Sequence, residues 1–257
     1  MQQRLRTDRL GTVLGVWAHP DDEVFLSAGL MGRIIDRGGH VACATATRGE
    51  RGTPDPTTWP LERLGRRRAI EIRASLAALG VTDHRFLGYL DGTLADVPDR
   101  EGTDRVAAVL DEVVPDTVVT FGSEGMTGHS DHVAVSRWTT AAVGEADRRI
   151  RLLYATTTER FCRRWASVNQ RLEAFGDGLP LATPEDEIAL ELRLGGDELD
   201  RKLVALAAQA SQIGPLVSIL GEDVFRDWWA TETFTTTLHE GRPAADDHPS
   251  APLAVTA

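Results

Sequence analysis

Short apolar runs alternate with longer amphipathic segments along the first half of the chain. Two of the runs, GTVLGVWA (11–18) and HVACATAT (40–47), are rich in β-branched residues and have the length of strands. Between them, VFLSAGLMGRIIDRG (24–38) carries apolar residues at helical spacing and ends on glycine. The pattern therefore begins with a strand, a helix and a second strand.

The same alternation continues to residue 122. Further helices are expected at 61–79, closed by Gly80, and at 105–114, and further strands at 83–89 and 116–122. Strands that alternate with helices in this way predict an α/β fold with a Rossmann-like, doubly wound, mostly parallel sheet and helices on both faces. Ligands of such sheets bind at the carboxyl ends of the strands.

The second half has a weaker pattern. We expect a helix over 133–148, a strand over 151–158 and an amphipathic helix over 197–213, whereas 169–196 fits no element and is long enough to form a lobe over the site. The final residues, 241–257, are rich in Pro, Ala and Asp. We therefore expect one domain over 1–240, followed by a disordered tail.

The overall composition and the net charge limit the class of partner. The 257 residues include 42% hydrophobic and 26% charged positions, which is near the average for globular proteins. The net charge of −11 argues against nucleic acid and against an anionic membrane surface, because both would be repelled. A small molecule is the expected partner, and the sequence leaves a homo-oligomer open.

The N-terminus and the cysteines point to an ordinary cytoplasmic protein. MQQRLRTDRL is too polar for a signal peptide, and no stretch approaches the roughly 18 apolar residues of a membrane span. The two cysteines, Cys43 and Cys162, have no CxxC neighbour and are expected to be small core residues.

Three polar motifs follow three of the expected strands. AHPDDE (18–23) follows the first strand, TRGE (47–50) the second, and GSEGMTGHSDH (122–132) the fourth. Because carboxyl ends of parallel strands share one edge of the sheet, we expect these motifs to meet. A buried, unpaired carboxylate costs several kcal/mol, so the three consecutive carboxylates of AHPDDE need compensation. A cation is the obvious candidate.

Histidines and aspartates of the first and third motifs form one candidate set: His19, Asp21, Asp22, His129, Asp131 and His132. This is the inventory of a catalytic zinc site, which uses three protein ligands and keeps a position open for water. Taken separately, an HxxH pair is common, and the acidic run 21–23 would favour the N-terminus of the next helix. Because both motifs occur at strand ends of one α/β chain, we favour the metal site.

These motifs resemble those of the PIG-L / LmbE-like family of metal-dependent N-deacetylases, whose members act on N-acetylglucosamine conjugates. The matching features are AHPDDE, TRGE, the R-x-x-E of Arg68 and Glu71, the LGYLDG turn (87–92) and GHSDHVAV. They span roughly the first 135 residues, while the second half matches weakly, through QASQ (209–212).

The resemblance implies a role for each member of the candidate set. His19, Asp22 and His132 would bind the metal, and Asp21 would be the general base. His129 would face the developing oxyanion, with Asp131 orienting its imidazole. Zinc is the expected metal, although iron or another divalent ion fits the same ligands. The implied reaction is attack of metal-bound water on an amide carbonyl, which removes an N-acetyl group from an N-acetylglucosamine-type conjugate.

Substrate contacts are implied in the same way. Arg68 and Asp91 would hydrogen-bond sugar hydroxyls; alternatively, Arg68 pairs with Glu71 or lies in solvent. Thr127 stands where some family members carry a tyrosine that assists at the oxyanion. Trp228 and Trp229 would stack on a sugar face or pack in the interior.

Two other functions remain open at this point. One is an amidase that cleaves a larger acyl group from an amino-sugar thiol conjugate or a glycosylated natural product. The other is a nucleotide-binding module, because GSEGMTG (122–128) lies between a strand and a helix. Its spacing is GxxGxxG, however, and the dinucleotide-binding motif is GxGxxG.

Overall fold

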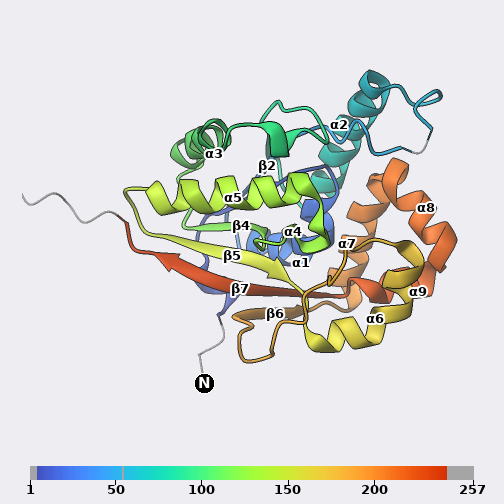
Figure 1. Cartoon of the computed structure of the whole chain (residues 1–257). Helices are drawn as coiled ribbons and strands as arrows, with labels where there is room; N and C mark the ends of the chain where they lie inside the picture. Colours follow the sequence, from blue (N-terminus) through green and yellow to red (C-terminus); the bar gives the residue numbers. More distant parts are fainter. Residues whose placement is uncertain (1–4, 54, 242–257) are drawn as a thin grey trace, which may run out of the picture.

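Seven strands form one sheet in the computed structural model, which describes residues 5–53 and 55–241 (Figure 1). The strand order is β3-β2-β1-β4-β5-β7-β6. The parallel strands are β1 (Val13–Trp17), β2 (Val41–Thr45), β3 (Asp83–Phe86), β4 (Thr117–Phe121) and β5 (Ile150–Thr156). At the far edge, β7 (Thr231–His239) pairs antiparallel with β5, and β6 (Leu190–Arg193) pairs antiparallel with β7. The predicted mostly parallel sheet is confirmed.

Helices cover both faces of the sheet. On one face α1 (Asp22–Ile35), α2 (Leu61–Ala78) and α7 (Gly196–Ala208) pack together, and α3 (Asp99–Val113) and α5 (Ser130–Glu145) cover the other (Figure 1). This doubly wound arrangement is the expected one. The remaining short helices are η1 (Thr7–Arg9), η2 (Leu94–Asp96) and α4 (Gly125–Gly128).

Three further helices gather where the parallel strands terminate (Figure 1). They are α6 (Glu159–Leu172), α8 (Ala210–Leu220) and α9 (Glu222–Trp228), and we refer to them together as the lobe. Of the segment 169–196, which was expected to form a lobe, only the end of α6 belongs to this group. The sequence pattern did not predict α6, α9, β6 or β7. These elements are short or strongly polar, so their periodicity gives a weak signal.

Several element boundaries differ from the expected ones. Helix α1 begins two residues early, at Asp22, and α3 begins at Asp99, directly after Pro98. The helix expected over 197–213 breaks at Gln209, and α7 and α8 meet there at an angle of 116°. The tail expected at 241–257 lies outside the described residues from 242 onward, so the division into one domain and a tail stays a prediction.

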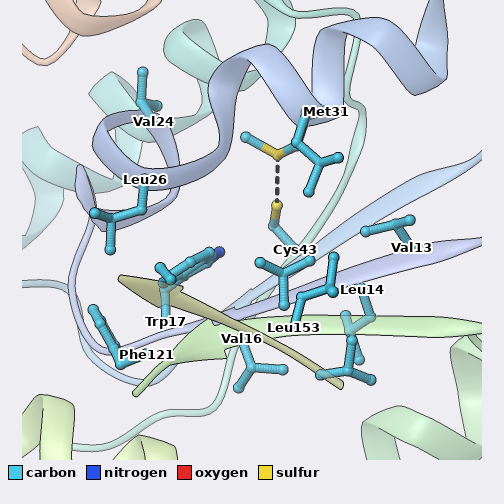
Figure 2. Close-up of a cluster of buried hydrophobic side chains, with 14 of the residues drawn as sticks. Val13, Leu14, Val16, Trp17, Val24, Leu26, Met31, Cys43, Phe121 and Leu153 are labelled. Atoms are coloured by element: carbon cyan, nitrogen blue, oxygen red, sulfur yellow. Dashed lines mark hydrogen bonds between the residues drawn. The ribbon is translucent and has the colours of Figure 1, made fainter. Parts of the chain in front are cut away.

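The central strands are buried on both sides. All residues of β1, β2 and β4 are buried, which explains their continuous apolar pattern. Figure 2 shows Trp17 beside Phe121, and their rings meet edge to face with centroids 5.1 Å apart. These aromatic residues end β1 and β4, so the core reaches directly to the base of the two main motifs.

The cysteines are both free. Cys43 is fully buried in β2, and its thiol lies 3.6 Å from the sulfur of Met31. Figure 2 shows the two sulfur atoms facing each other. Cys162 is partly buried on α6. Among the described helices, none alone is long and apolar enough to cross a membrane, and α7 with α8 reaches that length only as the bent pair.

A buried ion pair joins α7 to β7 and α1. Lys202 and Glu232 are 1% and 2% exposed, and Lys202 Nζ donates to Glu232 Oε1 at 2.8 Å and to the carbonyl of Phe25 at 2.7 Å. Glu232 also accepts hydrogen bonds from the backbone N–H groups of Gly29 and Leu30. Each charge is thus hydrogen-bonded, as burial requires.

Replacing Glu232 with alanine is expected to lower the free energy of unfolding by about 3–5 kcal/mol, because Lys202 would remain buried without its partner. Urea denaturation measures the loss. The control is Glu198→Ala, which breaks the more exposed pair of Arg33 and Glu198 between α1 and α7. That variant should lose no more than about 1 kcal/mol. Equal losses in the two variants would contradict the structural importance of the buried pair.

Candidate metal centre and active site

The AHPDDE and GHSDH motifs meet at the point where the sheet changes direction. Strands β1 and β4 are neighbours, but the chain leaves β1 towards β2 and leaves β4 towards β5. This divergence opens a crevice at the carboxyl ends of the two strands. There, His19 Nδ1 lies 3.1 Å from His132 Nε2, across 113 residues of sequence. The contact confirms that the two motifs converge.

Three donor groups face one another in this crevice. Asp22 Oδ2 lies 3.7 Å from His19 Nδ1, and Asp22 Oδ1 lies 3.4 Å from His132 Nε2. All three side chains are about nine-tenths buried. In addition, the Asp22 carboxylate accepts a hydrogen bond from the backbone N–H of His19, which holds it in place.

The outer nitrogen of each imidazole is already occupied. His19 Nε2 lies 3.1 Å from Asp91 Oδ1 and 3.2 Å from Asp131 Oδ2, and His132 Nδ1 lies 3.0 Å from the carbonyl of Gly125. Because carboxylate and carbonyl oxygens only accept, these outer nitrogens carry the protons. The two inner nitrogens then present lone pairs to each other beside a carboxylate, an arrangement that fits a cation.

The charges around His19 also favour a cation at this position. Burial disfavours a positive imidazole, but hydrogen bonds to Asp131 and Asp91 outweigh it and raise the pKa of His19 to about 10. Burial lowers the pKa of His132 well below its usual value. The surrounding carboxylates therefore stabilise one positive charge at His19, whether a proton or a metal ion supplies it.

His132 is held by the core and by the glycine-rich turn. Its ring stacks on Phe121 with centroids 4.2 Å apart and an interplanar angle of 10°. The segment GSEGMTG wraps around it, and the Gly125 carbonyl accepts its Nδ1 proton. Gly125 has φ +72°, and a Cβ there would lie 2.9 Å from the Cβ of His132, so a glycine at this position lets the turn pack against the histidine.

The expectation that the Asp131 carboxylate orients the imidazole of His129 is wrong. Its carboxylate accepts hydrogen bonds from the backbone N–H groups of Gly92 and Leu94, and it contacts His19 instead of His129. His129 is the N-cap of α5, and its Nδ1 accepts from the backbone N–H of Asp131. This leaves the His129 proton on Nε2, on an exposed ring that lines the crevice.

His129 also lies near enough to be a ligand. One ring nitrogen of each of His19, His129 and His132 falls within 4.8 Å of the others. Asp22 contacts both buried histidines and is itself buried, whereas His129 is exposed. The geometry thus offers two side chains, Asp22 and His129, for the third ligand position.

Asp21 occupies a strained backbone position at the start of α1. Its φ is 108° and its ψ is −31°, values that non-glycine residues rarely adopt. Strain of this kind concentrates at functional sites. Burial raises the pKa of the Asp21 carboxyl to about 7, against the opposing effect of the Arg68 charge. A carboxyl group with this pKa can both take up and release a proton near neutral pH.

Arg68 fixes Asp21 and the TRGE turn together. It is 3% exposed and donates to the carbonyls of Gly49 and Pro20 and to Asp21 Oδ2. The alternatives for Arg68, a pair with Glu71 or a position in solvent, are therefore wrong. Gly49 has φ +62°, and a Cβ there would collide with the Arg68 guanidinium, so this turn requires glycine.

The QASQ segment, only weakly matched from sequence, ties the lobe to the motifs. Gln209 donates to the buried carboxylate of Glu23, which in turn accepts the backbone N–H of Asp21. Burial raises the pKa of Glu23 to about 8. Ser211 donates to Glu71, and Gln212 donates to the carbonyl of Gly52. The break at Gln209 thus lies next to side chains that contact the motif residues.

A polar cavity of about 320 Å³ opens over the donor groups. Arg68 and Asp91 form part of its wall, and Asp91 also accepts the backbone N–H of Arg51. Arg51 and Gln212 line the same cavity and were not predicted from the sequence. Trp228 and Trp229 do not line this cavity, and their rings pack against Phe25 of α1.

Comparison with known proteins agrees with the motifs. The family model described as PIG-L: GlcNAc-PI de-N-acetylase matches residues 14–143. The chain belongs to the PIG-L family. The resemblance seen in the sequence is thereby confirmed. The PIG-L match begins in β1 and ends within α5, so the lobe lies outside it.

Individual relatives are also deacetylases. The chain is 32% identical over 236 residues to the 1D-myo-inositol 2-acetamido-2-deoxy-alpha-D-glucopyranoside deacetylase of Mycobacterium sp. (strain KMS), covering 81% of this chain and 76% of the relative. It is 32% identical over 273 residues to the enzyme of the same name from Acidothermus cellulolyticus, covering 91% of each. The N,N'-diacetylchitobiose deacetylase from Pyrococcus horikoshii shares the fold, with a TM-score of 0.62 and 20% identity over 90% of this chain and 85% of that one.

Proposed function

We propose that this PIG-L protein is a zinc-dependent hydrolase that removes the N-acetyl group from an N-acetylglucosamine-type conjugate. The observation that carries the proposal is the pair of facing imidazole nitrogens beside Asp22, with Asp21 next to them in the wall of a polar cavity. The names of the relatives, which specify acetamido sugars, support the substrate class.

His19, Asp22 and His132 are the proposed ligands. Two imidazoles and one carboxylate suit zinc, and iron or another divalent ion fits the same set. When bound, such a metal ion polarises a carbonyl oxygen and lowers the pKa of a water molecule. We choose Asp22 over His129 as the third ligand because Asp22 is buried and contacts both histidines.

Asp21 is the proposed general base. Hydrolysis joins the oxygen of water to the carbonyl carbon, breaks the carbon–nitrogen bond and gives the nitrogen one additional proton. Asp21 can take the proton from the water and return it to the departing amine, because its pKa is raised to about 7. The hydrogen bond from Arg68 keeps its carboxylate beside Asp22.

His129 is the proposed donor to the carbonyl oxygen. Its Nδ1 accepts a backbone hydrogen bond, which leaves an N–H on Nε2 at the wall of the crevice. A donor placed where negative charge develops stabilises the transition state. His129 thus donates the hydrogen bond to the carbonyl oxygen, which the short side chain of Thr127 does not. Asp131 acts on His19 and serves as a positioning residue.

The polar cavity is the proposed site for the sugar. Arg68 and Asp91 in its wall, together with Arg51 and Gln212, supply donors and acceptors suited to hydroxyl groups. The small molecule expected as partner is therefore an amino-sugar conjugate.

Metal analysis combined with an assay of amine release tests the proposal. The purified protein loaded with zinc should bind about one metal ion per chain. It should release acetate and a free amine from 1D-myo-inositol 2-acetamido-2-deoxy-α-D-glucopyranoside or from N-acetylglucosamine, and chelation should stop the reaction. Bound metal without amine release from either compound would overturn the proposed activity.

A further inference from the structure

A second cavity opens beside the donor groups, and its character is different. It has a volume of about 200 Å³, and Asp21, Asp22 and His132 form one end of it. Apart from these three residues and Thr127, every side chain that lines it is apolar. We refer to it as the apolar chamber; its main walls are Phe25, Leu26, Phe175, Leu216, Trp228 and Trp229.

The apolar chamber and the polar cavity meet at the proposed reacting centre. Asp21, Asp22 and His132 line both of them. An amide also has two sides, because the carbonyl carbon carries the acyl chain and the nitrogen carries the sugar. With the carbonyl at the shared residues and the sugar in the polar cavity, the acyl group lies in the apolar chamber.

The chamber is larger than an acetyl group needs. An apolar cavity of roughly 150 Å³ is enough to bind benzene, and this one is about 200 Å³. A neighbouring cavity of about 130 Å³ lies against the same wall residues Phe25, Leu26, Met126, Trp228 and Trp229. A single methyl group would leave most of this apolar surface in contact with water.

The walls come from α1, from the end of β4 and α4, and from the lobe with the residues that follow α6 and α9. Phe25 of α1 meets the rings of Trp228 and Trp229 edge to face, at 6.4 and 5.8 Å between centroids. The Trp228 N–H is satisfied by Asn169, so its ring can serve as an apolar wall. The chamber combines residues of the family match with residues beyond it. Of the fourteen that line it, eight lie within 14–143, and the six outside are Leu172, Ala174, Phe175, Leu216, Trp228 and Trp229.

We infer that the enzyme cleaves amino-sugar amides whose acyl group is longer than acetyl, with the acyl tail bound in the apolar chamber. This inference rests on the proposed function. The products are a carboxylic acid, which gains the oxygen of water, and the free amine of the sugar conjugate. The acyl chain contributes binding energy through apolar burial, so kcat/KM rises with its length until the chamber is full.

A series of substrates tests the inference. The zinc-loaded full chain is assayed for amine release from glucosamine carrying N-acetyl, N-butanoyl or N-hexanoyl groups. We expect kcat/KM to increase roughly three- to fourfold for each methylene buried. An enzyme that cleaves the acetyl compound best overturns the inference and leaves the proposed function intact. Absence of amine release from all three compounds overturns the proposed function itself.

A larger side chain in the apolar chamber should remove the preference for long acyl groups. Ala174 is partly buried and lines the chamber, so a phenylalanine there would occupy part of its volume. We expect Ala174→Phe to reduce the hexanoyl-to-acetyl ratio of kcat/KM at least about tenfold, because a few methylenes of the acyl chain would no longer be buried. The control is Ala166→Phe, an exposed position on α6, which should leave the ratio unchanged. An unchanged ratio in folded Ala174→Phe contradicts the inference.

A second variant and a second substrate complete the test. Leu216→Trp narrows the chamber from α8 and should reduce the same ratio if Ala174→Phe does not fold. The other occupant to examine is an apolar group attached through the sugar. If octyl N-acetylglucosaminide gains in kcat/KM while longer acyl groups do not, the chamber binds the aglycone and the inference is wrong.

Discussion

His132→Ala is expected to lose both the metal and the activity. The variant removes one of two facing imidazole nitrogens, and Asp22 loses the partner at 3.4 Å. Removing an outer partner of a metal ligand already costs roughly 10–100-fold in affinity or activity, so loss of the ligand should exceed about 100-fold. Elemental analysis after dialysis and amine release from an N-acetylated sugar measure the two effects.

The control for this variant is His40→Ala. His40 is 55% exposed and lies near Asp83, away from the crevice, so metal content and activity should stay at parental values. A thermal unfolding curve shows whether each variant is folded. A folded His132→Ala protein that keeps a full equivalent of metal would rule out His132 as a ligand.

The same assay decides the third ligand. If Asp22 is the ligand, Asp22→Ala should lose the metal and His129→Ala should keep it, because His129 would act on the carbonyl oxygen only. The reverse pattern would assign the third position to His129, whose ring nitrogen also lies within 4.8 Å of the other two.

Asp21→Asn is expected to keep the metal and lose turnover by roughly 10²–10⁴-fold, the usual contribution of a general base. Asparagine has nearly the same shape and can still accept the hydrogen bond from Arg68, but it cannot take a proton. His19, Asp22 and His132 are untouched, so the metal content should equal that of the parent. Steady-state kinetics with metal analysis separates this loss from the one in His132→Ala.

A matched control lies at the other end of α1. Asp36 is exposed and pairs with Arg201, so Asp36→Asn changes the same chemical group on the same helix, away from the site. It should retain full activity. An Asp21→Asn enzyme as active as Asp36→Asn would show that another group removes the proton from water.

Local pattern was sufficient for the framework of the site. The apolar runs that became β1, β2 and β4 are buried on both sides, and such strands are recognisable without knowing their neighbours. Once the strands are parallel, the motifs that follow them must share one edge of the sheet. The meeting of His19 with His132 was therefore predictable.

Polar pairing was less predictable. Asp131 was expected to orient His129, because the two are close in sequence, yet its carboxylate points to His19 and to the backbone of 92–94. One alternative for Arg68 was an ion pair with Glu71, one helical turn away. In the structure it donates to Asp21 and to the carbonyl of Gly49. In both cases a partner distant in sequence displaced a local one.

The lobe shows the same limit for whole elements. A continuous helix over 197–213 satisfies the apolar spacing, and no residue in it forbids a helix. The tertiary structure shows the chain turning at Gln209, whose side chain donates to the buried carboxylate of Glu23. The apolar chamber depends on this turn, because α8 carries Leu216 into its wall.

By itself, the sequence determined the α/β class, the parallel core and the residue types that gather at one edge of the sheet. These features follow from periodicity, since spacing along the chain decides which face of an element is buried. The tertiary structure alone decided which acceptor each imidazole proton meets, how Asp21 is held beside Asp22, and that an apolar chamber adjoins the site. Those features depend on atoms brought together from distant segments, where burial makes each polar group pair with the acceptor that lies closest in space.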